Sequence, residues 1–308
     1  MKDNDVIVVG SLNYDILFKQ ERLPHIGETY TADEVAFACG GKGANQATQC
    51  AKLGLNTYMV GKIGNDNFGS ILRTNLIKNH VNVDYLGESD TSSTGLGVVN
   101  AFNDGSVIAT ISKGANFDIL EQEIELVDPI FKRCSVLIIQ LEIPIEIVEL
   151  AAVKAKKHGK IVILNAAPAV PLTDRIRDNV DYLVVNETEA QFYTEISINS
   201  IEDAHKAAEV LWEEFHSKII ITLGESGSLY YDGSDYYFEP AKKVKAIETT
   251  GAGDSFVGAL AYSLINKFSV RETLQFCTAA SALTVQGIGA QESMPRLKEI
   301  KSFMQNGD

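Results

Sequence analysis

Histidine, cysteine and excess positive charge are all scarce in this sequence, and each scarcity argues against a class of protein. The chain has 308 residues, with 5 histidines and 4 cysteines. The histidines lie outside every motif described below, which disfavours a His-dependent hydrolase or a His-ligated metal site. The cysteines form no CxxC pair, which gives no zinc site and is typical of free thiols in a reducing compartment. We therefore expect a cytoplasmic protein.

The charge balance is acidic. The chain carries 27 Lys and Arg against 41 Asp and Glu, a formal net charge of −14. Such a chain has no general electrostatic attraction for nucleic acid or anionic lipid. No apolar run reaches the length of a membrane span, and the N-terminus has no secretory signal pattern. The sequence predicts no nucleic-acid or membrane partner, so any anion must be bound locally by backbone amides, a cation or a few lysines.

Short apolar strands alternate with amphipathic helices along most of the chain. The expected strands are residues 6–10, 57–61, 135–140, 161–165, 182–185 and 218–223. The expected helices include 43–54, 143–159 and 203–217, with two more in 254–285. This alternation predicts an α/β fold: a three-layer sandwich around a mainly parallel, doubly wound sheet. Because no linker or repeat interrupts it, we expect residues 1–308 to form one domain.

Two segments interrupt the α/β alternation. In residues 95–112, Asp104-Gly105 separates two alternating apolar stretches, a pattern typical of a tight hairpin. Residues 15–20 and 28–38 also read as antiparallel strands. We predict a small β-sheet inserted in the domain, formed by segments of about 14–39 and 95–112. Such a sheet covers a ligand, joins a partner, or is simply solvated.

Polar residues follow the ends of the expected strands. They are Ser11, Asn13 and Asp15; Glu142; Asn186, Glu187 and Glu189; Thr222 with Gly224; and the turn 248–254. One polar residue at a strand end is usually a turn or a cap. Ligands of open parallel sheets bind beyond the carboxyl ends of the strands, so five such ends together predict a polar cleft along one edge.

Two glycine-rich turns each open a helix. In GGKGANQA (40–47), glycines allow close approach of a ligand, while Lys42 offers a point charge and Asn45 paired donor and acceptor groups. A flexible turn with a solvated lysine is the alternative. In ETTGAGDSF (248–256), the helix start favours anions. Asp254 is there either an N-cap or a catalytic base. Neither turn has the spacing of a P-loop or of a dinucleotide-binding fingerprint.

These parts suit phosphoryl transfer to an alcohol. That reaction needs in-line positioning, neutralisation of phosphate charge and a base for the hydroxyl proton. The backbone N–H groups of Gly251, Ala252 and Gly253 would face the charge on the transferring phosphate, and Asp254 would accept the proton.

Together, the two turns resemble the paired signatures of the PfkB carbohydrate kinases. The resemblance runs from Val6 to the C-terminus, and its closest matches are to the ribokinases of that family, through QLE (140–142), NETEA (186–190), TLGESG (222–227) and GAQES (289–293). It implies a ribokinase-like fold and ATP-dependent phosphorylation of the primary hydroxyl of D-ribose. Kinases for deoxyribose, another sugar or a nucleoside remain alternatives, as does a non-catalytic sugar-binding protein.

The resemblance also implies roles for particular residues. The sugar would be held by Asn13, Asp15, Gly41, Lys42, Asn45 and Glu142, with Asp254 as base. ATP and Mg²⁺ would be bound by Asn186, Glu189, Thr222, Gly224 and Gly227. A monovalent cation, usually K⁺, would lie near Glu248, Thr250, Thr284, Gly287, Gly289 and Ser293. The small sheet would act as a lid and pair two subunits into a homodimer. One departure concerns the cation site, because Glu248 stands where ribokinases usually carry Asp.

Overall fold

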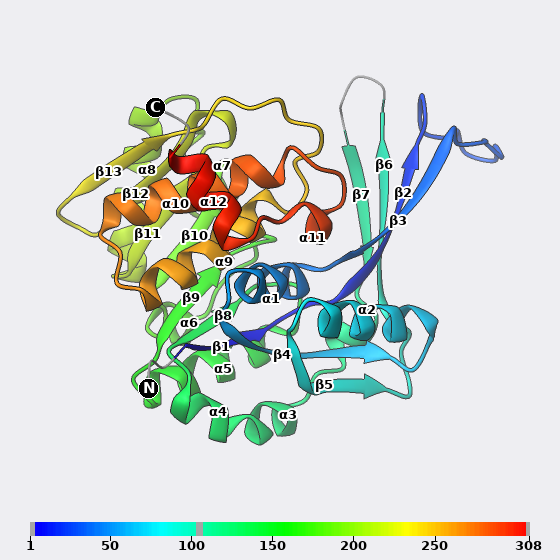
Figure 1. Ribbon diagram of the computed structural model, residues 1–308, viewed down its shortest axis with the longest axis horizontal. Helices are drawn as coiled ribbons and strands as arrows, with labels where there is room; N and C mark the ends of the chain where they lie inside the picture. Colours follow the sequence, from blue (N-terminus) through cyan, green and yellow to red (C-terminus); the bar gives the residue numbers. More distant parts are fainter. Residues whose placement is uncertain (1–3, 103–106, 306–308) are drawn as a thin grey trace.

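A large sheet and a small sheet organise the chain. The computed structural model describes residues 4–102 and 107–305, and within them nine strands form the large sheet in the order β13-β12-β11-β10-β9-β8-β1-β4-β5 (Figure 1). These strands are β1 (Asp5–Val9), β4 (Asn56–Gly64), β5 (Asn82–Ser89), β8 (Val136–Ile139), β9 (Ile161–Asn165), β10 (Tyr182–Asn186), β11 (Lys218–Thr222), β12 (Gly227–Tyr231) and β13 (Tyr236–Pro240).

The large sheet is mainly parallel, as predicted. Every adjacent pair from β5 to β11 runs parallel, and only β12 and β13 at one edge are antiparallel. Each predicted strand is present to within a few residues. Because the parallel strands share a direction, their carboxyl ends lie at one edge of the sheet.

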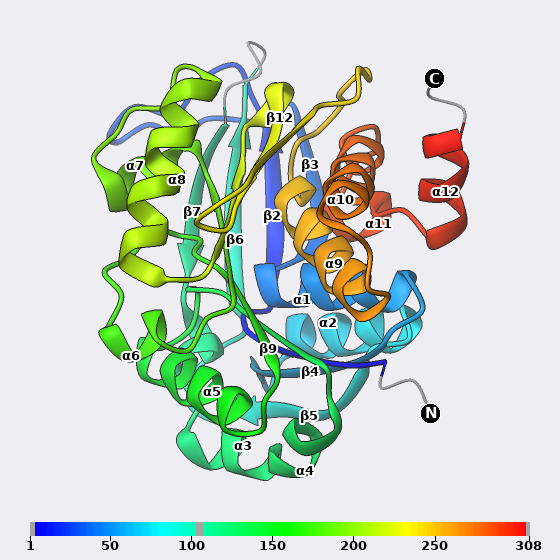
Figure 2. The same ribbon diagram turned by 90° about the vertical axis from the view of Figure 1, so that its left-hand side faces the viewer.

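Helices cover both faces of this sheet, which gives three layers (Figure 2). One face carries α3 (Glu121–Leu126), α4 (Asp128–Arg133), α5 (Ile145–Lys157), α6 (Asp174–Arg177), α7 (Glu187–Thr194) and α8 (Ile201–Phe215). The other face carries α1 (Lys42–Lys52), α2 (Asn67–Lys78), α9 (Ala252–Ile265), α10 (Val270–Thr284) and α12 (Leu297–Gln305). Short turns of helix lie at η1 (Gly114–Phe117), η2 (Gly224–Ser226) and α11 (Ala290–Ser293). None of the helices in the described ranges has the length and apolar character needed to cross a membrane.

The central strand β1 shows why the sheet is buried on both sides. Its side chains alternate between two apolar clusters: Ile7 and Val9 belong to one, and Val6 and Val8 to the other. All four are fully buried. Successive side chains of a strand point to opposite faces, so an unbroken apolar run specifies a strand with helices on both sides.

The small sheet follows directly from β1. Its order is β3-β2-β6-β7, formed by β2 (Asn13–Lys19), β3 (Glu34–Gly40), β6 (Gly95–Ala101) and β7 (Val107–Ser112). The predicted antiparallel pairs β2–β3 and β6–β7 are confirmed. The parallel pairing of β2 with β6 was not predicted. Residues 28–33, expected to belong to a strand, precede β3 instead, and the turn at Asp104-Gly105 lies outside the described residues.

Candidate active site

The carboxyl ends of β1 and β8 meet, as the predicted cleft requires. Ser11, just beyond β1, donates a hydrogen bond from Oγ to Oε2 of Glu142, just beyond β8, at 2.5 Å. The backbone N–H of Lys42 donates to the same carboxylate oxygen at 3.3 Å. The ends of two strands and the start of α1 therefore converge on Glu142.

The GGKGANQA turn is packed tightly against the end of β1. Gly41 has φ +88°, and a Cβ there would lie 2.6 Å from the backbone nitrogen of Asn13. A Cβ on Gly43 would lie 2.7 Å from the nitrogen of Ser11. Only glycine permits such contacts. Lys42 is partly buried, so the alternative of a flexible turn with a solvated lysine is wrong.

Asp254 lies in the first turn of α9 but does not cap it. The N-cap is Gly251, with φ +81°, and no side chain caps this helix. Asp254 is only 7% exposed. Its Oδ2 accepts a hydrogen bond from Asn45 Nδ2 at 2.8 Å, and its Oδ1 accepts one from Gln46 Nε2 at 2.9 Å. The capping interpretation of Asp254 is therefore wrong, since its carboxylate is hydrogen-bonded to α1 and not to the N–H groups of its own helix.

The surroundings of Asp254 shift its pKa in opposite directions. Burial raises the pKa of Asp254, while the Lys42 ammonium and the hydrogen bonds from Asn45 and Gln46 favour the ionised form. Burial by itself would lower the pKa of Lys42, but the carboxylates of Asp254, Glu142 and Glu189 outweigh it, and that pKa is raised. Lys42 is therefore a protonated counter-charge inside an acidic cluster.

Asp15 lies on β2 between two glycines of the neighbouring strands. A Cβ on Gly40 of β3 would come within 2.0 Å of Asp15 Oδ2, and one on Gly97 of β6 within 2.2 Å of its Oδ1. Burial, reinforced by the charges of Glu142, Glu248 and Asp254, raises the pKa of Asp15 to about 7. The two glycines thus leave the space that the Asp15 carboxylate occupies, and burial of that carboxylate has a desolvation cost.

Asn13 is oriented by Asn116, a residue that the sequence analysis missed. Asn116 Nδ2 donates to Asn13 Oδ1 at 2.8 Å and to the carbonyl of Leu12 at 3.1 Å, while its Oδ1 accepts from Leu12 N at 2.8 Å. Because the side-chain oxygen of Asn13 is thereby engaged, the side-chain NH₂ group of Asn13 remains available to a ligand.

The residues expected at the nucleotide end lie at or just beyond the ends of β10 and β11. Asn186 and Glu189 form a reciprocal capping box at the start of α7: Glu189 N donates to Asn186 Oδ1, and Asn186 N to Glu189 Oε2, each at 2.8 Å. Thr222 Oγ1 donates to the carbonyl of Val185 at 3.3 Å. Gly224 and Gly227 both have positive φ.

Burial raises the pKa of Glu189, although Asn186 and Lys42 oppose it. One carboxylate oxygen of Glu189 stays outside the capping box, so a hard cation such as Mg²⁺ fits this donor set.

The segments expected to form the monovalent-cation site are joined to one another. Glu248 Oε2 accepts from Gly289 N at 2.9 Å, and Ser293 Oγ donates to the carbonyl of Gly289 at 2.6 Å. A Cβ on Gly287 would lie 2.5 Å from Ser293 Cβ, which shows how closely the turn is wound. Thr284 differs, because its hydroxyl donates to Ala280 O within α10 at 2.9 Å, while its carbonyl accepts from Gly287 N at 3.3 Å. Thr250 is exposed, next to Gly251. Within the described ranges, no group of three or more His, Cys, Asp or Glu could hold a metal ion, so a cation here would rely on carbonyl and hydroxyl oxygens.

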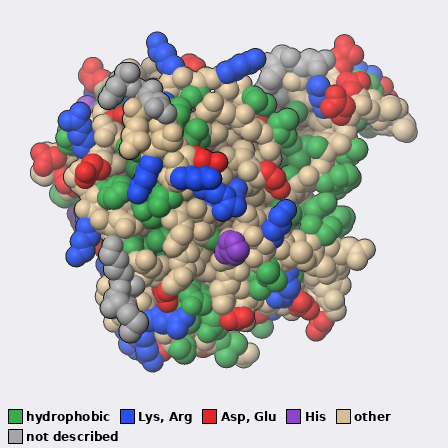
Figure 3. Space-filling view, viewed as in Figure 1, with side chains coloured by type: hydrophobic (Ala, Val, Ile, Leu, Met, Phe, Trp, Pro, Cys, Tyr) green, Lys and Arg blue, Asp and Glu red, His purple; other side chains and the backbone are tan. Residues whose placement is uncertain are grey.

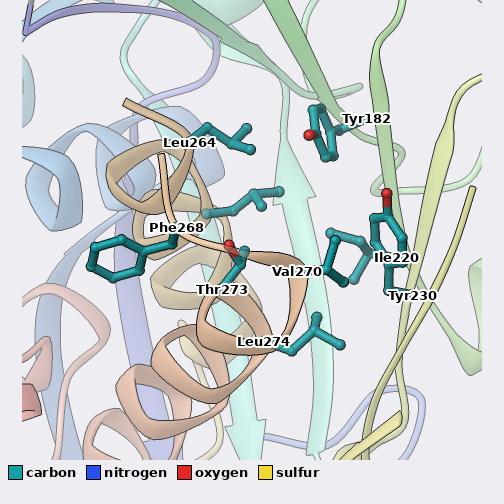
Figure 4. A pocket seen from close by; sticks show the side chains of 9 residues that line it. Tyr182, Ile220, Tyr230, Leu264, Phe268, Val270, Thr273 and Leu274 are labelled. Carbon is teal, nitrogen blue, oxygen red and sulfur yellow. The ribbon is translucent and has the colours of Figure 1, made fainter. Parts of the chain in front are cut away.

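A pocket elsewhere in the molecule is not this site. It lies between α9–α10 and the sheet and is lined by Tyr182, Ile220, Tyr230, Leu260, Leu264, Phe268, Val270, Thr273 and Leu274 (Figure 4). Tyr182 begins β10, and Tyr230 is near the end of the antiparallel β12, so the pocket faces the opposite edge of the sheet. Its lining is mainly apolar, as expected for a gap in core packing.

Four buried amides near Asp254 had no role assigned from the sequence. They are Gln46, Gln140, Asn165 and Gln291. Gln46, Gln140 and Gln291 lie inside the quoted motifs GGKGANQA, QLE and GAQES, which was the available signal. The sequence does not show which of several neighbouring polar side chains turns inward.

An aspartate at a helix start, bonded to polar groups at the carboxyl edge of a parallel sheet, is an arrangement that suits phosphoryl transfer to an alcohol. The chain matches the family described as pfkB family carbohydrate kinase over residues 3–297. It is 35% identical to a ribokinase of Schizosaccharomyces pombe, covering 96% of each chain, and 33% identical to a deoxyribokinase of Salmonella typhi, covering 97% and 98%. A solved structure of Arabidopsis thaliana ribokinase complexed with ribose and ATP superposes with a TM-score of 0.89 at 32% identity, covering 97% and 98%.

The chain therefore belongs to the pfkB family of carbohydrate kinases. It is an ATP-dependent sugar kinase with a ribokinase-like fold, as the sequence predicted.

Proposed function

We propose that this kinase transfers the γ-phosphoryl group of ATP to the 5-hydroxyl of D-ribose, giving ribose 5-phosphate and ADP. The observation that carries the proposal is the polar cluster of Asn13, Asp15, Lys42, Asn45 and Glu142 beside Asp254. Its amides and carboxylates match vicinal hydroxyls. Gly41 lets this turn pack directly against the backbone at Asn13, which brings the start of α1 to the cluster. The relatives named ribokinase, among them one complexed with ribose and ATP, support the same substrate.

Asp254 is proposed as the base. It takes the proton of the 5-hydroxyl as that oxygen attacks the phosphorus atom. The backbone N–H groups of Gly251, Ala252 and Gly253, at the positive end of α9, would stabilise the charge on the transferring group. A Cβ on Gly253 would meet no atom within 4 Å, so a ligand can approach this backbone closely.

Two cations complete the proposal. When bound, Mg²⁺ neutralises phosphate charge, and K⁺ orders the turn that carries the anion site. Asn186 and Glu189 would hold Mg²⁺ through water, while Thr222, Gly224 and Gly227 line the path of ATP. The carbonyls near Glu248, Thr250, Thr284, Gly287 and Gly289, with the Ser293 hydroxyl, would hold K⁺. The hydrogen bonds that join Glu248, Gly289 and Ser293 support a shared role for these segments.

The small sheet is proposed as a lid that also joins two subunits. In the strand register, Asp15 pairs with Ala38 and Gly97, which places these residues on the inner face. Val35, Phe37 and Ile108 fall on the opposite face, where they are 53%, 58% and 46% exposed. Figure 3 shows hydrophobic side chains gathered at the side of the molecule that carries this sheet. Such a patch on a sheet suits self-association, so we expect a homodimer in the cytoplasm. Sedimentation of the protein and of Phe37→Asp tests the dimer.

Deoxyribose is the main rival substrate, because a deoxyribokinase is similar over nearly the whole chain. A nucleoside would need an apolar slot for its base next to a cluster that is polar instead. The test is ADP release with Mg-ATP and D-ribose, deoxyribose, fructose or adenosine, with and without K⁺. We expect the highest kcat/KM on D-ribose and stimulation by K⁺. A higher kcat/KM on another substrate would replace ribose, and no ADP with any of them would favour a non-catalytic sugar-binding protein.

The role of Asp254 has its own test. Asp254→Asn keeps nearly the size and shape of the side chain, but the amide cannot accept the proton. We expect turnover to fall by about 10³-fold or more, while ATP affinity measured by calorimetry changes little. Substantial activity in this variant would mean that another group is the base.

A further inference from the structure

Asp254 receives hydrogen bonds from two consecutive residues of α1, and only Asn45 has a role in the proposed sugar site. We propose that Gln46 is a positioning residue: it fixes the orientation of the Asp254 carboxylate and holds it in the ionised form that accepts the substrate proton. This inference rests on the proposed function of Asp254 as the base.

The amide of Gln46 is fully buried and has no freedom to reverse. Its Nε2 donates to Asp254 Oδ1 at 2.9 Å and to Asn165 Oδ1 at 3.0 Å, and its Oε1 accepts from Gln140 Nε2 at 2.6 Å. Both N–H bonds and the carbonyl oxygen are therefore used. A reversed amide would place its oxygen against two other oxygens, those of Asp254 and Asn165.

Asn165, at the end of a sheet strand, fixes this orientation of the Gln46 amide. It ends β9, and its Nδ2 donates to the backbone carbonyl of Val184 in β10 at 3.3 Å. A backbone carbonyl can only accept, so it turns the Asn165 oxygen towards Gln46. The direction of the hydrogen bond that reaches Asp254 is thus set by the backbone of the central sheet.

Gln140 supports Gln46 at a cost. Within the described part of the chain, its buried Oε1 has no hydrogen-bond partner. A Cβ on Gly10 would lie 1.9 Å from that oxygen, so the glycine leaves the space that this amide occupies. Leaving a buried acceptor unpaired is unfavourable, and buried polar groups that bear this cost call for a functional explanation. Donation from Nε2 to Gln46 supplies one here.

Asn45 is anchored in the same way from the other side. Its Oδ1 accepts from Gln291 Nε2 at 2.9 Å, and Gln291 Oε1 in turn accepts from Asn75 Nδ2 at 2.6 Å. Each oxygen of Asp254 thus faces an N–H group whose orientation is fixed. A carboxylate accepts both bonds, but a carboxylic acid would have to aim its own O–H at a donor, so the amides favour ionised Asp254.

The charges that face Asp254 would not keep it ionised by themselves. Lys42, on α1, favours the ionised form, whereas Glu142, beyond β8, opposes it. Glu189 on α7 and Asp15 on β2 add negative charge to the same cluster. With several carboxylates around one ammonium, the neutral donors Asn45 and Gln46 become important to keep Asp254 ionised despite its burial.

A matched pair of variants isolates Gln46. Gln49 lies on the same helix and is also fully buried, but its Nε2 donates to the carbonyl of Pro295 at 3.0 Å and its Oε1 accepts from Ser255 Oγ at 2.9 Å. Gln46→Met and Gln49→Met therefore remove equally buried amides, and only the first removes a bond to Asp254. We expect Gln46→Met to lower kcat by about 10- to 100-fold with little change in the KM of ATP. Its acidic limb in the pH profile of kcat should move up by about one to two units.

A second measurement needs no turnover. The pKa of Asp254 can be followed in the ligand-free protein by NMR with ¹³Cγ-labelled aspartate, its signal identified by loss in Asp254→Asn. We expect a higher pKa in Gln46→Met than in the unmodified protein and in Gln49→Met. Equal pKa values and equal pH profiles in all three proteins would overturn the role of Gln46. If Asp254→Asn is inactive but Gln46→Met behaves like Gln49→Met, only this inference fails; if Asp254→Asn stays active, the proposed base fails instead.

Discussion

Asn116 Nδ2 donates a hydrogen bond to Asn13 Oδ1 at 2.8 Å, joining a residue of η1 to the first residue of β2. The two are separated by 103 positions in the chain. The same amide also bonds both the N–H and the C=O of Leu12, so it clamps the connection between the large sheet and the small one. Asn116 thereby decides which end of the Asn13 amide is left available to the proposed sugar.

Replacement of Asn116 should therefore impair sugar binding more than ATP binding. In Asn116→Ala, Asn13 can rotate, and two backbone groups of Leu12 lose their partner in a buried position. We expect the KM of the sugar to rise by about 10-fold or more and the free energy of unfolding to fall by about 2–3 kcal/mol. Steady-state kinetics with each substrate varied, together with urea unfolding, measure both.

Asn116→Asp is the sharper control. It retains an oxygen to accept the Leu12 N–H but has no N–H for Asn13 Oδ1. If Asn116→Asp binds sugar as well as the unmodified protein, orientation of Asn13 is not what Asn116 provides.

The positions of Gly40 and Gly97, beside Asp15, should not tolerate even alanine. In Gly97→Ala, the new Cβ would lie 2.2 Å from Asp15 Oδ1, so the carboxylate must leave its position. We expect the KM of the sugar to rise by about 10-fold or more, while ATP binding is retained. Val98→Ala is the control, because Val98 pairs with Ile16 on the opposite face of the small sheet. An unchanged sugar KM in Gly97→Ala would show that Asp15 does not need this slot.

Asp15 should make both stability and sugar affinity depend on pH. Burial and nearby carboxylates raise its pKa from 3.8 to about 7 in the folded protein. The folded state therefore retains a proton that the unfolded chain has already lost, and the ligand-free protein loses stability as pH rises from about 4 to about 7. Asp15→Asn should reduce this loss and raise the melting temperature at pH 8.

The same variant should bind sugar poorly, since an ionised carboxylate is the stronger acceptor for hydroxyls. For the unmodified protein, we expect the KM of the sugar to increase as pH falls from 8 to 6. Melting curves and sugar KM values across that range test the two effects separately. A melting temperature at pH 8 that is unchanged or lower in Asp15→Asn would contradict the proposed cost of burying this carboxylate.

The fold was more predictable from the sequence than the hydrogen bonds of the site. Short apolar runs rich in β-branched residues, such as 6–10 and 161–165, favour buried strands, and the polar residues at their ends predicted the edge where the polar cluster lies. The same patterns left Asp254 open between a cap and a base, because a helix start favours both. Gln46 and Asn116 went unassigned because their partners lie far away in the chain, at Asn165 and Asn13.

The interaction of Glu248 with Gly289 provides a test of the cation site. Glu248 Oε2 accepts from Gly289 N at 2.9 Å, and the backbone N–H groups of Ile247 and Glu248 both donate to the carbonyl of Val285. The side chain thus closes a turn that the backbone has already brought together. We expect Glu248→Ala to weaken activation by K⁺ and to lower kcat by about 10-fold, with little change in sugar KM.

Glu248→Gln separates the hydrogen bond from the charge. Its amide oxygen can still accept the Gly289 N–H, but the negative charge near the proposed cation is lost. ADP release measured against KCl at constant ionic strength should then show a larger loss of K⁺ affinity than of kcat at saturating K⁺. If neither variant changes the response to K⁺, the segment from Glu248 to Ser293 does not bind the activating cation, and its hydrogen bonds serve only to hold α10 and α11 beside the start of α9.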